Sequence, residues 1–247
     1  MENITSRANP LLTHMKKLAA DGAYRRQSGE FLCDSPKLLA EALAFHAPIT
    51  AVVSTTGVTV EGARCATVPE DVMASVSPMK TPQGVMFTVR LPSLTPPEIL
   101  SPGRYVALDG VQDPGNVGTV LRTLDAFDGD GLLLLPGCAD PFSPKTVRAS
   151  MGAVFRRPVW SVTVPELADL AEKSGLPLYG AALRSDTVDA REVDLRRCIM
   201  AIGSEGRGLS DAVLALCRPT VRIPMSPRCE SLNAAVAASV LLWEGYR

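Results

Sequence analysis

The sequence predicts an α/β protein whose second half is built on a mainly parallel sheet. From about residue 104 onward, strand-like apolar segments alternate with helix-like segments, the pattern of a parallel sheet covered by helices on both faces. The segment Leu132–Leu135 contains no polar residue, as expected of a strand that is buried on both sides. Hydrophobic residues make up 46% of the chain, which is enough to fill such a core.

A proline-rich segment divides the chain into two predicted domains. Prolines stand at positions 92, 96, 97 and 102, and neither a helix nor a central strand tolerates that density. We therefore expect a small α/β domain over residues 1–91, a linker over 92–103 and a larger α/β domain over 104–247. In the first domain the patterns predict helices that begin at Asn9-Pro10 and Ser35-Pro36, and strands over 30–33, 49–53 and 84–89.

The second domain shows a regular order of strands and helices. The patterns predict strands over 105–108, 132–135, 178–182, 198–202 and 221–223. They predict helices over 116–127, from 145, over 166–173, over 211–217 and from Ser231 to the end of the chain. Ser210-Asp211 and Ser231 are residue types that cap a helix N-terminus. The last helix would carry Leu232, Val236, Val240 and Trp243 on one apolar stripe.

Composition excludes several classes of protein. The formal net charge is -1, so any RNA-binding surface must be a local patch. No run of about 18 apolar residues and no signal-peptide pattern is present, so we expect a cytoplasmic protein without a membrane partner. The six cysteines show no CxxC spacing and no clustered ligands, so we expect no metal. Both histidines, His14 and His46, lie in the first domain, which argues against histidine-based catalysis in the second.

The first chemistry-bearing segment is DGVQDPGNVG over residues 109–118, which leads to Arg122. It follows a predicted buried strand and opens a helix. Polar, flexible residues at the carboxyl end of a strand are where open α/β sheets bind ligands. An ordinary strand-to-helix turn with a solvated arginine is the alternative interpretation.

Two further segments have the same strand–loop–helix character. In IGSEGRGLSD, residues 202–211, the glycines permit close approach of a ligand to the backbone. Their spacing is not that of a dinucleotide-binding or phosphate-binding loop, which argues against a nicotinamide-dependent oxidoreductase. Glu205 is either a polar anchor or a surface carboxylate. In the third segment, residues 221–233, Ser231 and Asn233 either cap the last helix or bind a ligand.

The three segments together resemble the SpoU/TrmH family of RNA methyltransferases, within the SPOUT class. The resemblance lies in DPGNVGTVLRT, PFSPKTVRASMGAVFRRPV, IGSEGRGLSD, and RIPM followed by ESLNAAVAASVLLWE. The first domain is similar to the small substrate-binding domain of the family through ITSRANPLLTHMKKL and TPQGV. Residues 33–37, Cys-Asp-Ser-Pro-Lys, depart from the Glu-Gly pair usual in the family, so the RNA target stays open.

The resemblance implies a fold, a reaction and a donor site. The fold would be a parallel-sheet SPOUT domain whose C-terminal part forms a deep trefoil knot, preceded by the small substrate-binding domain. The reaction would be methyl transfer from S-adenosylmethionine (AdoMet) to a ribose 2′-hydroxyl of rRNA or tRNA. Backbone groups of Gly203, Ile223 and Leu232 would hold the donor without a metal. Members of the family are similar in forming homodimers through the catalytic domain.

The resemblance also implies catalytic residues, namely Asn116, Arg122, Glu205, Ser231 and Asn233. A guanidinium stays protonated at neutral pH, so we expect Arg122 to orient the ribose and stabilise the developing oxyanion. A phosphate or a water molecule would take the proton. A catalytically silent RNA-binding or assembly factor and a base-directed methyltransferase, with Glu205 or Asp109 recruited, are the alternatives.

Local basic residues are the candidates for contacting RNA phosphates. Lys16, Arg25 and Arg26 lie in the first domain, and Arg148 and Arg156 lie near the expected active site. Any single one of them has ordinary solvated surface charge as its alternative.

Overall fold

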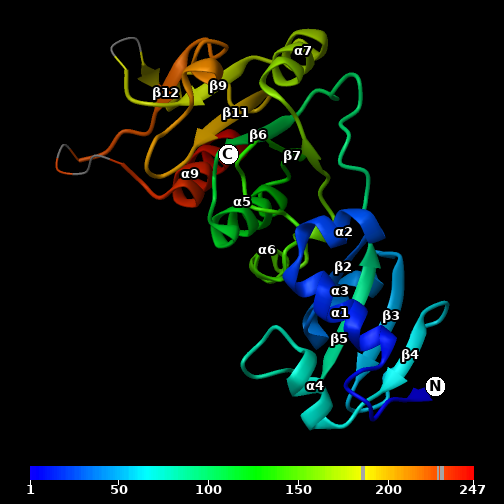
Figure 1. The fold of residues 1–247 in the computed structure, drawn as a ribbon. Helices are drawn as coiled ribbons and strands as arrows, with labels where there is room; N and C mark the ends of the chain where they lie inside the picture. The colour runs from blue at the N-terminus through cyan, green and yellow to red at the C-terminus, as the bar shows by residue number, and fades with distance from the viewer. Residues whose placement is uncertain (185–186, 227, 229–230) are drawn as a thin grey trace. The chain divides into compact units, whose positions relative to one another are not determined.

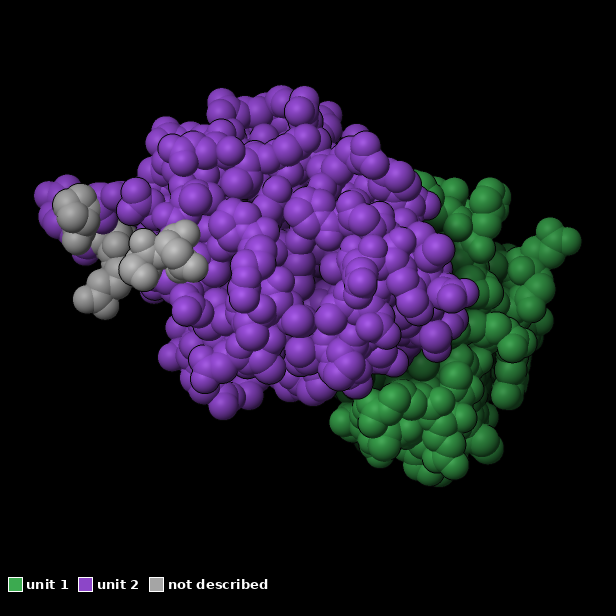
Figure 2. Space-filling model, turned by 90° about the horizontal axis from the view of Figure 1, so that it is seen from above, with its two compact units in different colours: residues 1–92, 140–155 green, residues 93–139, 156–247 purple. Residues whose placement is uncertain are grey.

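The computed structural model describes residues 1–184, 187–226, 228 and 231–247. The chain divides into two compact units, which Figure 2 colours separately: residues 1–92 with 140–155, and residues 93–139 with 156–247. The segment 140–155 thus belongs to the first unit, although its sequence lies within the predicted larger domain. It carries helix α6 (Pro144–Ser150) and a short 3₁₀ turn (Ala153–Phe155).

The first unit contains a mixed sheet with the strand order β1-β4-β3-β5-β2 (Figure 1). Strand β5 pairs antiparallel with β2 and β3, whereas β4 pairs parallel with β1 and β3. The strands are β1 (Glu2–Asn3), β2 (Glu30–Cys33), β3 (Ile49–Ser54), β4 (Arg64–Thr67) and β5 (Val85–Arg90). The helices of residues 1–92 are α1 (Pro10–Ala20), α2 (Gly22–Ser28), α3 (Pro36–Ala44) and α4 (Glu70–Val76).

The predicted starts of α1 and α3 are confirmed. The side chains of Asn9 and Ser35 accept hydrogen bonds from the backbone N–H groups of Leu11 (2.8 Å) and Leu38 (3.1 Å), with proline in the first turn of each helix. The elements α2, β4 and α4 were not predicted. Helix α2 has no long apolar stripe and begins at the Asp21-Gly22 pair, which also reads as a turn.

The second unit contains a sheet in which every described strand pair is parallel, as the sequence predicts. The strand order is β10-β12-β9-β11-β6-β7-β8 (Figure 1). The central strands are β6 (Arg104–Asp109), β11 (Cys198–Gly203) and β9 (Leu178–Ala181). The remaining strands are β7 (Gly131–Leu134), β8 (Val159–Ser161), β10 (Val188–Asp189) and β12 (Thr220–Arg222).

Helices cover both faces of this sheet. Leu167 and Leu170 of α7 pack in one apolar core with sheet residues such as Leu133 and Ile199. Helices α5 and α9 lie side by side on the other face (Figure 1). The helices are α5 (Pro114–Ala126), α7 (Val164–Ser174), α8 (Asp211–Leu214) and α9 (Ala234–Tyr246), with a 3₁₀ turn over Ala190–Glu192. In the described part of the chain, no helix has the length and apolar character that a membrane span requires.

Two predicted helix boundaries in the second unit were wrong. Helix α9 begins at Ala234, and its N-cap is Asn233, whose side chain accepts from the backbone of Ala235 (2.9 Å) and Val236 (3.3 Å). Ser231, the predicted cap, lies before the helix. Helix α8 ends at Leu214, three residues earlier than predicted, because it closes in a tight turn before β12.

Candidate active site

A cavity of about 280 Å³ lies at the carboxyl ends of β9, β11 and β12. Parallel strands end at the same edge of a sheet, so the loops that follow them converge there. The start of α9 and the residues that precede it complete the lining. The lining residues are Ala181, Ala182, Leu183, Ile202, Gly203, Ser204, Glu205, Gly208, Val221, Arg222, Ile223, Met225, Ser231, Leu232, Ala234 and Ala237.

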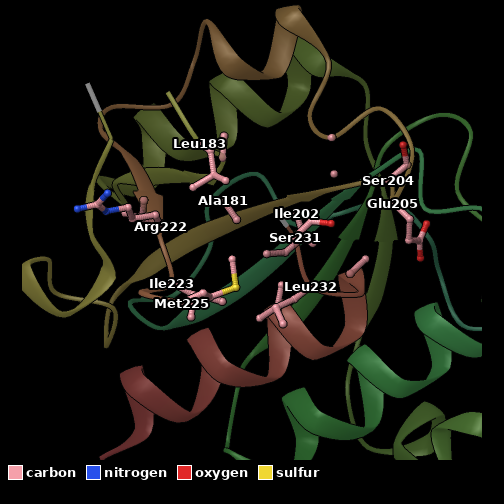
Figure 3. A pocket seen from close by; sticks show the side chains of 16 residues that line it. Ala181, Leu183, Ile202, Ser204, Glu205, Arg222, Ile223, Met225, Ser231 and Leu232 are labelled. Carbon is pink, nitrogen blue, oxygen red and sulfur yellow. The ribbon is translucent and has the colours of Figure 1, made fainter. Parts of the chain in front are cut away.

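The cavity has an apolar middle and polar ends. In Figure 3 the side chains of Ile223, Met225 and Leu232 gather in the middle of the view. Glu205 and Arg222 lie at opposite ends. An apolar slot with polar groups at its ends suits a ligand that combines a flat apolar ring with charged groups.

Gly203 sets the shape of the loop that follows β11. Ser204 and Gly208 exchange two backbone hydrogen bonds, of 3.1 Å and 2.8 Å, which fold the loop back on itself. A Cβ atom on Gly203 would lie 2.0 Å from the carbonyl carbon of Gly208 and 2.2 Å from the nitrogen of Leu209. No other residue type fits there unless the backbone moves, so the loop requires glycine at this position.

A chain of side-chain hydrogen bonds links the first, second and third motifs. The Nδ2 group of Asn233 donates to Oδ1 of Asn116 at 3.2 Å. The Nδ2 group of Asn116 in turn donates to Oε1 of Glu205. Three of the predicted catalytic residues, from segments about 90 and 117 positions apart, are therefore in contact.

The order of donors along this chain follows from helix capping. Asn233 uses its amide oxygen to cap α9, so only its amide nitrogen is left to donate to Asn116. Asn116 must then accept with its oxygen and donate with its nitrogen, and a carboxylate is the matching acceptor at the end of the chain. A second contact ties the motifs together, since Asp109 accepts from the backbone N–H of Ser210 at 2.7 Å.

Of the remaining predicted site residues, four line the cavity and Arg122 does not. Gly203, Ile223 and Leu232, the predicted donor-binding residues, line the cavity together with Ser231, a predicted catalytic residue. Arg122 is exposed on α5 and does not line the cavity. No described residue forms a hydrogen bond or an ion pair with its guanidinium.

One of the predicted RNA contacts does not fit the structure, and a second is held in an ion pair. Arg25 is buried, where its guanidinium pairs with Asp140 at 2.6 Å and donates to the carbonyl of Leu18. Arg156 binds Asp125 at 2.7 Å. Arg25 is buried, so we withdraw it from the proposed phosphate contacts, whereas the side chain of Arg156 is partly exposed and stays a candidate.

The other predicted RNA-binding residues fall into two classes. Lys16 and Arg26 are exposed and stay candidates for phosphate contacts. Arg148 pairs with Asp34 at 2.5 Å, and its side chain is 33% exposed.

Sequence reasoning missed part of the cavity wall. Ala181 and Leu183 follow β9, and Met225 follows β12. They carry no polar or glycine signal, and apolar residues after a strand are read as core. The order of the sheet, with β9 between β12 and β11, is the information that places them at the site.

Comparisons with known proteins agree with this geometry. The model of the SpoU rRNA Methylase family matches residues 103–243. An uncharacterized tRNA/rRNA methyltransferase of Synechocystis sp. is 34% identical, covering 99% of this chain and 93% of that protein. The 23S rRNA (guanosine(2553)-2′-O)-methyltransferase RlmP of Bacillus subtilis is 31% identical, covering 98% of each. The crystal structure of an AdoMet-bound rRNA methyltransferase from Sinorhizobium meliloti superposes with a TM-score of 0.88 at 29% identity, covering 99% of this chain and 97% of that one. The chain therefore belongs to the SpoU rRNA methylase family.

Proposed function

We propose that this protein transfers a methyl group from AdoMet to a ribose 2′-hydroxyl of rRNA or tRNA. The observation that carries the proposal is the cavity around Gly203 where the loops after β9, β11 and β12 meet the start of α9. The names of relatives support it, because RlmP is a ribose 2′-O-methyltransferase of 23S rRNA and the Sinorhizobium structure contains AdoMet. Because the relatives act on rRNA or tRNA, we also infer a cytoplasmic location.

The residues that line the cavity fit AdoMet. Ile223, Met225 and Leu232 offer an apolar wall for a flat adenine ring. The absence of a side chain at Gly203 lets the loop after β11 fold back on itself, which gives the cavity this wall. AdoMet supplies an electrophilic methyl group on a sulfonium, which needs no metal to activate it. Within the described residues no cluster of metal-ligating side chains is found.

The chain's own residues hold and polarise the ribose. Asn116, Asn233 and Glu205 form a preorganised set of donors and acceptors, and Glu205 and Ser231 line the cavity itself. Arg122 stabilises the oxyanion that develops on the ribose oxygen. A phosphate or a water molecule accepts the proton, because a guanidinium does not lose its own.

We also propose that the two domains have different roles and that the C-terminal part of the chain is knotted. Residues 1–91, completed by the segment 140–155, form the RNA substrate-binding domain, residues 92–103 the linker and the rest of 104–247 the methyltransferase domain. The lack of any described helix or strand over residues 92–103 supports the linker. A deep trefoil knot in the C-terminal part is supported by the convergence of the loops after β11 and β12 on one cavity.

The proposed activity predicts a specific product. Incubation of the protein with AdoMet and total RNA from a strain that lacks its gene should yield 2′-O-methylated nucleosides after nuclease digestion and mass spectrometry. Asn116→Asp should lower the yield on the order of 100-fold, because a second carboxylate beside Glu205 breaks the hydrogen-bond chain. A methyl group on a base, or no methylation, would contradict the proposal.

We further propose a homodimer that forms through α9. Val236, Val240 and Trp243 lie at helical spacing and are 48%, 38% and 51% exposed, which leaves an apolar stripe on the surface. Trp243 extends this stripe to Phe127 and Tyr246, with ring centroids 5.5 Å and 6.3 Å away. A second copy of the stripe is a matching partner, as in symmetric dimers.

The dimer interface is tested by placing a charge in the stripe. Val240→Glu should weaken dimerisation at least about tenfold, because the interface would have to bury an unpaired carboxylate. Ile99→Glu is the matched control, since Ile99 is 59% exposed in the same unit but outside α9. Sedimentation velocity should show a dimer for the wild type and Ile99→Glu and a monomer for Val240→Glu. A wild-type monomer, or a dimer unaffected by Val240→Glu, contradicts this interface.

A further inference from the structure

Asp109 is a half-buried carboxylate at the carboxyl end of β6, next to the proposed AdoMet cavity. Strands β6 and β11 pair in parallel, and their last residues, Asp109 and Gly203, are partners in the register. Asp109 is not among the residues that line the cavity. Its Oδ2 atom accepts from the backbone N–H of Ser210 at 2.7 Å. The proposed methyl transfer gives this carboxylate no role, so its contact needs a separate explanation.

The loop that joins β11 to α8, residues 204–210, is attached to the segment after β6 at both of its ends, and we call it the donor loop. Near its start, Glu205 accepts from Nδ2 of Asn116, and Glu205 also lines the cavity. At its end, Ser210 donates to Asp109, and the preceding residue, Leu209, is buried in the core. The position of the donor loop against β6 therefore depends on Asp109 as well as on Asn116 and the packing of Leu209.

The contact with Asp109 stands where a local helix cap would be expected. Ser210 is the N-cap of α8, and in a capping box the residue three positions later supplies an acceptor to the N–H of the N-cap. Helix α7 of the same unit has such a box. In α8 the corresponding residue is Val213, which has no polar side chain, and the acceptor comes from Asp109, 101 positions away. A local glutamate would cap α8 equally well, so what the distant carboxylate adds is a link between β6 and the donor loop.

Such a link determines how often the donor loop is in position. A hydrogen bond to a carboxylate is roughly twice as strong as a neutral one, so it favours the position against β6 over positions farther away. When only a fraction of the molecules has the loop in position, the apparent dissociation constant of AdoMet rises by the inverse of that fraction. Saturating AdoMet draws the remaining molecules into the binding conformation, so the rate at saturation is preserved.

We propose that Asp109 is a positioning residue for AdoMet, which acts through the backbone of Ser210 to hold the donor loop in the conformation that binds AdoMet. The inference rests on the proposed function, because it takes the cavity around Gly203 as the AdoMet site. It adds to that function a side chain outside the cavity lining that controls the affinity for the methyl donor.

Asp109→Ala should raise the dissociation constant and the KM of AdoMet about tenfold, the effect of losing one hydrogen bond to a charged group. The kcat at saturating AdoMet should stay within about twofold of the wild type. Asp109→Asn keeps an oxygen that accepts from Ser210 and should recover most of the affinity. Isothermal titration calorimetry and steady-state kinetics measure these constants. An unchanged KM, or a fall in kcat without a rise in KM, overturns the proposal.

Asp130→Ala is the matched control for loss of a structural hydrogen bond. Asp130 is also half-buried, and its Oδ2 atom accepts from the backbone N–H of Arg104 at 2.7 Å, the same bond at the opposite end of β6. Asp130→Ala should lower the temperature of unfolding and leave AdoMet affinity within about twofold of the wild type. If Asp130→Ala weakens AdoMet binding as much as Asp109→Ala does, the effect of Asp109 is a general loss of stability and the proposal is wrong.

The same bond is removed from the donor side by Ser210→Pro. Proline has no backbone N–H, and the φ angle of Ser210, -65°, is one that a proline ring adopts. Ser210→Ala is the matched comparison, because it also loses the hydroxyl but keeps the N–H. Ser210→Pro should bind AdoMet about tenfold more weakly than Ser210→Ala. In the double variant with Asp109→Ala the losses should not add, since both changes remove one bond, and additive losses overturn the proposal.

The outcomes separate this inference from the proposed function. If the wild type does not bind AdoMet, the proposed function and the inference fail together. If the wild type binds AdoMet and methylates RNA while Asp109→Ala does both with unchanged constants, only the inference fails. If Asp109→Ala does not fold, the comparison of Ser210→Pro with Ser210→Ala decides, because Asp109 is intact in both.

Discussion

Gly203→Ala is expected to weaken AdoMet binding on the order of 100-fold and to remove methylation with it. The added methyl group would overlap the backbone of Gly208 and Leu209, so the loop would have to open. Opening breaks the two backbone hydrogen bonds between Ser204 and Gly208. At up to about 1.5 kcal/mol for each bond, and a factor of ten for every 1.4 kcal/mol, the loss reaches about 100-fold. Isothermal titration calorimetry with AdoMet measures it.

Gly206→Ala is the matched control for this prediction. Gly206 lies in the same loop, has an ordinary φ angle and has no atom within 4 Å of the position of a Cβ. The same chemical change there should leave AdoMet affinity unchanged within about twofold. Thermal unfolding of both variants separates a local change in the loop from loss of the fold. If folded Gly203→Ala binds AdoMet as tightly as Gly206→Ala does, the donor is not held at this loop.

Much of the second unit could be predicted from the sequence because local signals agree with the final packing. The apolar strands, the proline-started helices and the glycine-rich turns each specify their own structure, and a parallel sheet then places their loops at one edge. The start of α9 was predicted three residues too early because Ser231 and Asn233 are both good caps. In the structure Asn233 is the cap, because its amide oxygen accepts from the backbone of Ala235. Its amide nitrogen also donates to Asn116.

The partners of charged residues could not be predicted in the same way. Arg25 and Arg148 find their carboxylates 115 and 114 positions away in the sequence. A basic patch in a sequence looks the same whether its guanidinium groups face solvent or pair with distant acids. The same limit explains why the sequence placed 140–155 in the second domain, whereas Asp140 and Arg148 bind residues of the first unit.

Arg122→Ala is expected to lower the turnover of methylation by about 10² to 10³-fold, the range found when one group that stabilises an oxyanion is removed. AdoMet affinity should not change, because Arg122 does not line the cavity. Arg122→Lys should recover only part of the activity, since an ammonium keeps the charge but lacks the planar pair of donors. Single-turnover kinetics with saturating RNA, together with AdoMet calorimetry, measures both quantities. Near wild-type turnover in Arg122→Ala would remove Arg122 from the mechanism.

Because Arg122 is exposed and lies outside the cavity, an experiment can show whether it acts on the cavity of its own protomer or on that of the other protomer. A heterodimer of one Arg122→Ala protomer and one Gly203→Ala protomer, isolated with two different tags, has one intact cavity and one intact Arg122, on different chains. If Arg122 acts on the cavity of the other protomer, one of the two sites is complete and the heterodimer should have about half of the wild-type activity. If Arg122 acts within its own protomer, neither site is complete and the heterodimer should be as inactive as either homodimer. Because each variant alone is expected to be inactive, the recovered activity reports directly on whether the reaction needs both subunits.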